Sequence, residues 1–103
     1  MIFKIKERLI LLQILPTQGS LSEMVEIMDL AKQLKLNDEE KNSVSFNEDS
    51  KGNITWDIDK DPNIDITISS DMIKILKETI NKLDKDKKIT PQLVDLAIKI
   101  TKL

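Results

Sequence analysis

Residues 44–58 read VSFNEDSKGNITWDI, and this stretch decides the fold that we expect. Apolar and polar side chains alternate in residues 44–46 and again in residues 54–58, on either side of a polar turn that contains Gly52. A period of two is typical of a strand with one apolar face, and two such runs joined by a glycine-containing turn predict a β-hairpin. We expect its apolar face, which includes Trp56, to cover the core.

The segments next to the hairpin are predicted to add one strand, one buried helix and one short helical turn. Residues 64–68 alternate isoleucine with polar side chains, which predicts a third antiparallel strand and hence a three-stranded sheet. Upstream, the dense apolar block 9–15 predicts a buried helix that ends at Pro16. The segment 38–42 predicts one further short helical turn before the hairpin.

Residues 21–34 predict an amphipathic helix, because their apolar side chains recur every three or four positions. Gly19 and Ser20 precede it as turn and N-terminal cap. We expect one continuous stripe of this helix to face the core, made of Leu21, Met24, Val25, Met28, Ala31 and Leu34 and widened by Ile27 and Leu30.

Two further helices are expected after the sheet. Residues 70–83 carry a helical apolar stripe, and Thr90 followed by Pro91 predicts the start of a last helix. Val94 and Ile98 lie beside the main stripe of that last helix, so they are candidates for contact with another chain. The whole chain of 103 residues is thus predicted to be one α+β domain, because it has the usual length of one domain and no long linker.

Helix, helix, short helix and hairpin is the element order of a winged-helix module, which makes nucleic-acid binding an alternative function. The short helix would enter the DNA groove, yet it offers Asp38, Glu39 and Glu40 to a polyanion. The hairpin turn supplies Lys51 as its one basic side chain. Phosphate neutralisation dominates affinity for DNA, so nucleic acid is disfavoured as a partner, and Lys51 is the residue on which this alternative depends.

The composition disfavours an enzyme and predicts no cofactor and no metal. The chain has no histidine, cysteine or tyrosine, so the usual general bases, nucleophilic thiols and transition-metal ligands are missing. Asp57, Asp59 and Asp61 alternate like the first ligands of a calcium loop. That loop requires glycine at its sixth position and glutamate at its twelfth, where this chain has Pro62 and Ile68.

The N-terminal segment resembles a targeting signal only superficially. The apolar stretch 9–15 is short, contains Gln13 and is followed by no small residues at cleavage spacing, so we expect no signal peptide. It is also too short to span a membrane. We therefore expect a cytoplasmic protein with no membrane partner.

Several short runs resemble those of small uncharacterised bacteriophage and prophage proteins. They are Glu7-Arg8-Leu9 through Ile14-Leu15-Pro16 with Gly19, Asp38-Glu39-Glu40, Gly52-Asn53-Ile54-Thr55-Trp56, and Leu83-Asp84-Lys85 before Ile89-Thr90. The resemblance spans nearly the whole chain and brings no active-site residues with it. It implies a phage-type accessory or assembly protein in the cytoplasm of a bacterial host cell.

The leading hypothesis is a small non-catalytic protein–protein interaction module that binds another protein or a second copy of itself as a homo-oligomer. The candidate partner-binding residues are Asp38, Glu39, Glu40, Trp56, Val94 and Ile98. Two alternatives stay open: a nucleic-acid-binding winged-helix protein, and an inhibitor of a host defence system whose acidic surface occupies the place of nucleic acid.

Overall fold

The computed structural model describes all 103 residues and has the predicted α+β class, with two helices at the C-terminal end. In chain order the elements are β1 (Ile2–Phe3), α1 (Ile5–Ile14), α2 (Leu21–Leu34), α3 (Asp38–Ser43), β2 (Asn47–Glu48), β3 (Ile54–Thr55), the 3-10 helix η1 (Ile58–Lys60), β4 (Ile64–Asp65), α4 (Ser70–Lys85) and α5 (Val94–Thr101). None of the helices has the length and apolar character that a membrane crossing requires.

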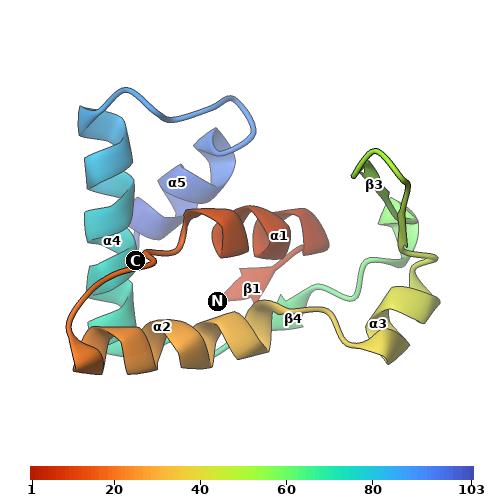
Figure 1. The fold of residues 1–103 in the computed structure, drawn as a ribbon, viewed down its shortest axis with the longest axis horizontal. Helices are drawn as coiled ribbons and strands as arrows, with labels where there is room; N and C mark the ends of the chain where they lie inside the picture. The colour runs from red at the N-terminus through yellow and green to blue at the C-terminus, as the bar shows by residue number, and fades with distance from the viewer.

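Helices α1, α2, α4 and α5 form a body around one aliphatic core (Figure 1). α4 packs against both α2 and α5, and α1 packs against α2. The apolar side chains of α4 at Met72, Ile75, Leu76 and Ile80 are all buried, as expected for a helix with one apolar face. Burial of these aliphatic side chains away from water is the main force that holds the body together.

Helix α2 has two apolar faces, and only part of the predicted stripe faces the core. Ile27, Leu30 and Leu34 are its buried residues. On the opposite side of the helix lie three exposed apolar side chains: Leu21, Val25 and Met28 are 84%, 60% and 64% exposed. The spacing is helical for both sets, so periodicity identifies the helix without telling which set faces the core. The predicted cap is confirmed, because the Ser20 hydroxyl accepts a hydrogen bond from the backbone of Glu23.

The strands form two separate two-stranded sheets instead of one three-stranded sheet. β2 and β3 make a hairpin, as expected, with Asn47 opposite Thr55. β2 lies within the segment that was predicted as the turn, because residues 47–48 continue the pairing beyond the alternating run 44–46. β4, which was predicted to extend this hairpin, pairs antiparallel with β1 and places Ile64 opposite Phe3. Alternation fixes which face of a strand is apolar but not which strand is its neighbour. β4 lies beside β1 because the adjacent Ile66 is buried in the same core as Phe3.

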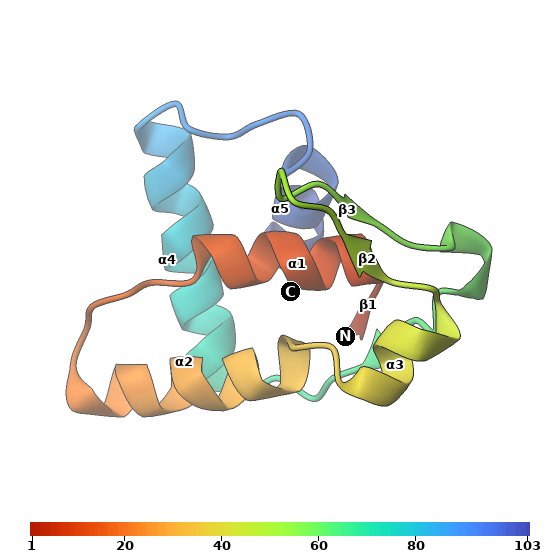
Figure 2. The same cartoon turned by 45° about the vertical axis from the view of Figure 1, so that its right-hand side comes forward.

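Residues 37–63, which we call the arm, lie at one end of the molecule, and α4 lies at the other (Figures 1 and 2). The arm contains α3, the hairpin and η1, and none of these elements holds a buried residue. Val44 is the only buried residue in the arm. The expectation that the hairpin covers the core with its apolar face is therefore wrong.

The element order of a winged helix is present from α1 to β3, but the packing differs from that class. In a helix-turn-helix module the third helix packs on the first two. Here α3 buries none of its residues, and α4 and α5 complete the core instead. The arm is thus an appendage of a helical body that has its own core.

Candidate protein-docking site on the arm

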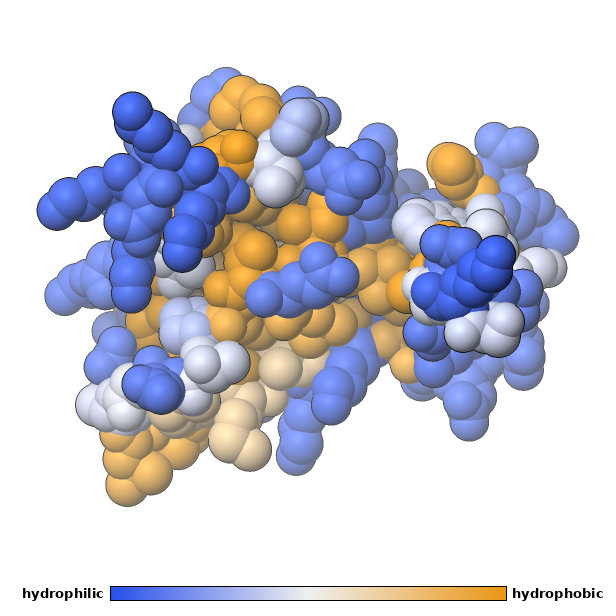
Figure 3. Space-filling model, turned by 45° about the horizontal axis from the view of Figure 1, so that its top comes forward, coloured by the Kyte–Doolittle hydropathy of each residue, from blue (hydrophilic) through white to orange (hydrophobic).

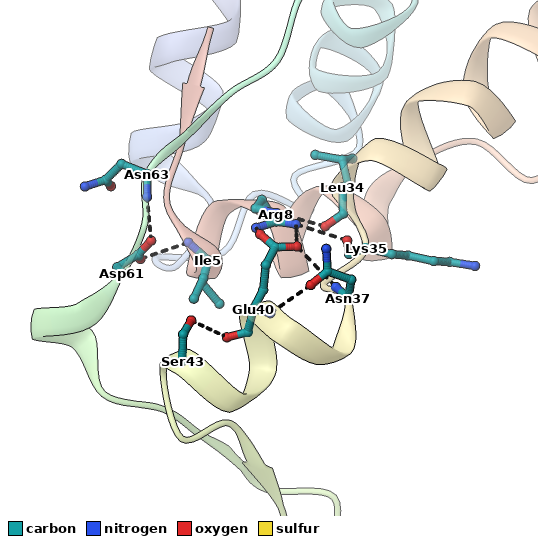
Figure 4. Close-up of polar contacts among 9 residues, drawn as sticks. All are labelled: Ile5, Arg8, Leu34, Lys35, Asn37, Glu40, Ser43, Asp61 and Asn63. Carbon is teal, nitrogen blue, oxygen red and sulfur yellow. Dashed lines mark hydrogen bonds and ion pairs between the residues drawn. The ribbon is translucent and has the colours of Figure 1, made fainter.

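A buried arginine joins the arm to the body. Arg8 on α1 is 1% exposed, and its Nε donates a hydrogen bond to the carbonyl oxygen of Leu34 at 2.9 Å. Its Nη2 donates to the carbonyl oxygen of Lys35 at 3.0 Å, so the guanidinium satisfies carbonyl groups that the end of α2 leaves free. The same guanidinium holds the carboxylate of Glu40 on α3 with two hydrogen bonds of 2.8 and 3.2 Å (Figure 4).

This arrangement also explains the charge state of Glu40. Hydrogen bonding from Arg8 lowers the pKa of the Glu40 carboxyl, against the opposing effect of burial, and the backbone N–H of Asn37, which donates to the same carboxylate, lowers it further. Glu40 also completes the cap of α3, because its backbone N–H donates to the Asn37 side chain at 2.8 Å. The orientation of α3 is therefore fixed by charged and polar contacts, with no help from apolar burial of its own.

Asp61 anchors the far end of the arm. Its carboxylate accepts a hydrogen bond from the backbone N–H of Ile5 at 2.9 Å, at the first residue of α1. The other carboxylate oxygen accepts from the backbone of Asn63 at 3.1 Å (Figure 4). Asp57 caps η1 by accepting from the backbone N–H of Asp59, so the carboxylates of Asp57 and Asp61 have different partners. No group of three or more potential metal ligands comes together in the structure.

The hairpin places two aromatic rings side by side. The register that sets Asn47 opposite Thr55 places Phe46 opposite Trp56 one position further from the turn. Their ring centroids are 6.5 Å apart and their planes differ by 18°, and the Lys41 ammonium lies over the Phe46 ring. Trp56 is half-buried by this stacking and does not belong to the core of the body.

An exposed apolar hollow adjoins Trp56. It measures about 260 Å³ and is lined by Ile54, Thr55, Trp56 and Ile58. Ile54 is 37% exposed and Ile58 is 74% exposed. Figure 3 shows the arm on the right as a hydrophilic knob interrupted by apolar atoms. We call Ile54, Trp56 and Ile58 the arm patch.

The arm patch lies within an acidic segment of the chain. The arm contains eight acidic and three basic side chains. Asp38 and Glu39 are exposed and take part in no ion pair. At the hairpin turn, hydrogen bonds from Asn53 lower the pKa of Asp49, which keeps that carboxylate charged.

The structure divides the predicted binding residues into three groups. Asp38, Glu39 and Trp56 lie on the arm with accessible side-chain atoms, whereas the carboxylate of Glu40 is engaged by Arg8. Val94 and Ile98 lie on α5 in the body, 41% and 47% exposed, and the arm does not include them. Lys51 is exposed at the hairpin turn, where its backbone N–H donates to Asp49 at 2.8 Å.

Sequence reasoning missed three kinds of residue. Ile54 and Ile58 were expected in the core, and the exposed face of α2 was expected to be buried. In both cases the apolar side chains share one face as predicted, but that face is exposed to solvent. Arg8 was not singled out, although an isolated arginine inside an apolar helix is a signal for a buried ion pair. No protein-family model, curated protein or solved structure matches the chain.

Proposed function

We propose that the protein is a small non-catalytic binding module whose arm docks on a basic surface of a protein partner that also presents an apolar side chain. The observation that carries this proposal is the arm patch: Ile54, Trp56 and Ile58 are held at the surface within a strongly acidic segment.

The apolar part of the proposal follows from the cost of exposure. Ile58 leaves 74% of its surface in water although the body has a core that other isoleucines enter. A contiguous apolar group next to a tryptophan is typical of protein-binding surfaces, where large aromatic side chains contribute much of the binding energy. A partner that buries the arm patch would remove its apolar surface from water, which stabilises the complex.

The basic part follows from charge. Eight carboxylates against three ammonium groups give the arm a negative potential, which attracts a basic surface and accelerates its encounter with the arm. The same potential repels phosphate, so it favours a protein over nucleic acid as the partner. Lys51 is the only basic group of the hairpin turn, which leaves the nucleic-acid alternative with little support.

The composition supports a non-catalytic role. The titratable groups outside the backbone termini are carboxylates, lysines and one arginine, and that arginine is committed to Glu40 and two carbonyl oxygens. The resemblance to phage proteins suggests an accessory or assembly role, and inhibition of a host defence protein is a second role that the same docking chemistry would serve.

The sole tryptophan of the chain makes this proposal directly testable. We expect basic peptides with one large apolar residue to shift Trp56 fluorescence to shorter wavelength, and we expect the shift to weaken as ionic strength rises. Matched acidic peptides should give no shift. The Ile58→Ser variant should lose binding, while Val25→Ser, which removes an exposed apolar side chain from α2, should bind like the native chain. Equal response to acidic and basic peptides would contradict the proposal.

A further inference from the structure

The end of the molecule opposite the arm carries unpaired positive charge. Residues 82–88, at the end of α4 and in the loop after it, contain four lysines and two aspartates. None of these lysines takes part in an ion pair of the molecule. Their hydrophilic side chains gather at the upper left of Figure 3. These ammonium groups are available to carboxylates of another molecule.

An apolar groove lies beside these lysines. It measures about 300 Å³, and its apolar lining consists of Ile14, Pro16 and Leu83. Its polar lining consists of Thr79, Lys82, Asp86 and Lys88, so the charge of the lining is positive by one. We call it the α4 groove. Its chemistry complements that of the arm patch, because the half-buried apolar side chains of the groove reach its surface and the charges around the two surfaces are opposite in sign.

We propose that copies of this chain associate head to tail, with the arm patch of one copy seated in the α4 groove of the next. This inference rests on the proposed function, since it identifies the partner of the arm as a second copy. A two-fold symmetric contact through the arm would place acidic arm against acidic arm, and one through the α4 groove would place lysines against lysines. Only the head-to-tail contact brings opposite charges together.

The position of the two surfaces sets the form of the assembly. They lie at opposite ends of a molecule whose longest dimension is 35 Å, so one copy can use both at once (Figure 1). Such a heterologous contact continues from copy to copy and produces open chains, or rings where the rotation closes. Each surface offers only three apolar side chains, so we expect a small, weak and salt-sensitive interface.

Sedimentation velocity at rising protein concentration tests this assembly. The native chain should form species larger than a dimer at low ionic strength and return to monomer at high ionic strength. Lys82→Gln with Lys88→Gln should weaken association about tenfold. The matched control is Lys32→Gln with Lys102→Gln, which removes the same charge from exposed positions outside the groove and should leave association unchanged.

Mixing two defective variants distinguishes head-to-tail contact from symmetric contact. Ile58→Ser disables the arm and keeps the groove, whereas the Lys82→Gln, Lys88→Gln variant disables the groove and keeps the arm. At a protein concentration at which the native chain assembles but each variant alone is monomeric, their mixture should form one-to-one heterodimers that grow no further. A mixture that stays monomeric, or a native chain that stops at a dimer, would overturn the proposal.

The outcomes also separate this inference from the proposed function. A native chain that remains monomeric at every concentration, yet binds basic peptides through Trp56, refutes self-assembly and retains the docking function. A chain that neither assembles nor responds to basic peptides refutes both. Assembly that is insensitive to Ile58→Ser but sensitive to Val25→Ser would assign self-association to the exposed face of α2 and refute the head-to-tail contact.

Discussion

Arg8 is the residue on which the attachment of the arm depends. Its guanidinium makes hydrogen bonds to two carbonyl groups of the body and to Glu40 on the arm. A buried ion pair of this kind adds little net stability compared with apolar groups of the same size, but removal of one partner leaves the other charge uncompensated. The pair therefore acts mainly by specifying where α3 lies.

Glu40→Gln should lower the free energy of unfolding by about 1–3 kcal/mol, because it removes the negative charge opposite a buried guanidinium. Glu39→Gln is the control, since that side chain is exposed and unpaired, and its effect should stay within about 0.5 kcal/mol. Urea unfolding followed by circular dichroism measures both. Equal effects of the two substitutions would show that the pair does not hold α3.

The contribution of this pair should depend on pH in a defined direction. Because the pKa of Glu40 is lowered in the folded protein, its carboxylate stabilises the fold fully above the ordinary value of 4.5. That stabilisation is lost as pH falls through the lowered pKa. The difference in unfolding free energy between the native chain and Glu40→Gln should therefore be constant near neutral pH and shrink in acid below 4.5. A difference that grows in acid would contradict this assignment.

At the scale of elements, helix α1 begins with a cap from a distant part of the chain. The carboxylate of Asp61 receives the backbone N–H of Ile5, which lies 56 positions earlier. Asp61→Ala should lower the free energy of unfolding by about 1 kcal/mol, the usual value of a lost helix cap. Asp59→Ala, two residues away and exposed, accepts no hydrogen bond through its side chain and should have little effect. Thermal unfolding of the two variants makes the comparison.

The elements also show how far local sequence determines structure. The caps at Ser20 and Asn37 and the presence of a hairpin around Gly52 were predictable, because they depend on residues close together in the chain. The position of β2 was not, since residues 47–48 have no apolar alternation. The pairing of β4 with β1 was not predictable, since both strands are only two residues long and are far apart in the sequence. The orientation of α2 was not predictable either, because both of its faces are apolar and only tertiary packing selects one.

The candidate site was predicted in part for the same reason. Asp38, Glu39 and Trp56 were identified from charge and residue type, which do not depend on packing. The exposure of Ile54 and Ile58 was missed because alternation indicates a shared face without telling whether that face is covered. Glu40 was grouped with its acidic neighbours, and only the position of Arg8 distinguishes it from them.

At the scale of the whole molecule, the body and the arm should open independently. The arm has one buried residue, Val44, whereas the body holds the continuous core. In native-state hydrogen exchange, the amides of Asp49 and Asp57, which are hydrogen-bonded within the hairpin, should exchange through local opening. The amides of Leu76 and Ile80 in α4 should exchange only through global unfolding. Equal protection in the two regions would show that they unfold as one unit.

The separation of fold and docking surface has an evolutionary consequence. Ile54 and Ile58 contribute little to the core, so natural selection for stability does not constrain them. Arg8, Glu40 and Asp61 are constrained instead, because they hold the arm to the body. Descendant chains adapting to new partners are thus expected to retain these three residues while the arm patch diverges.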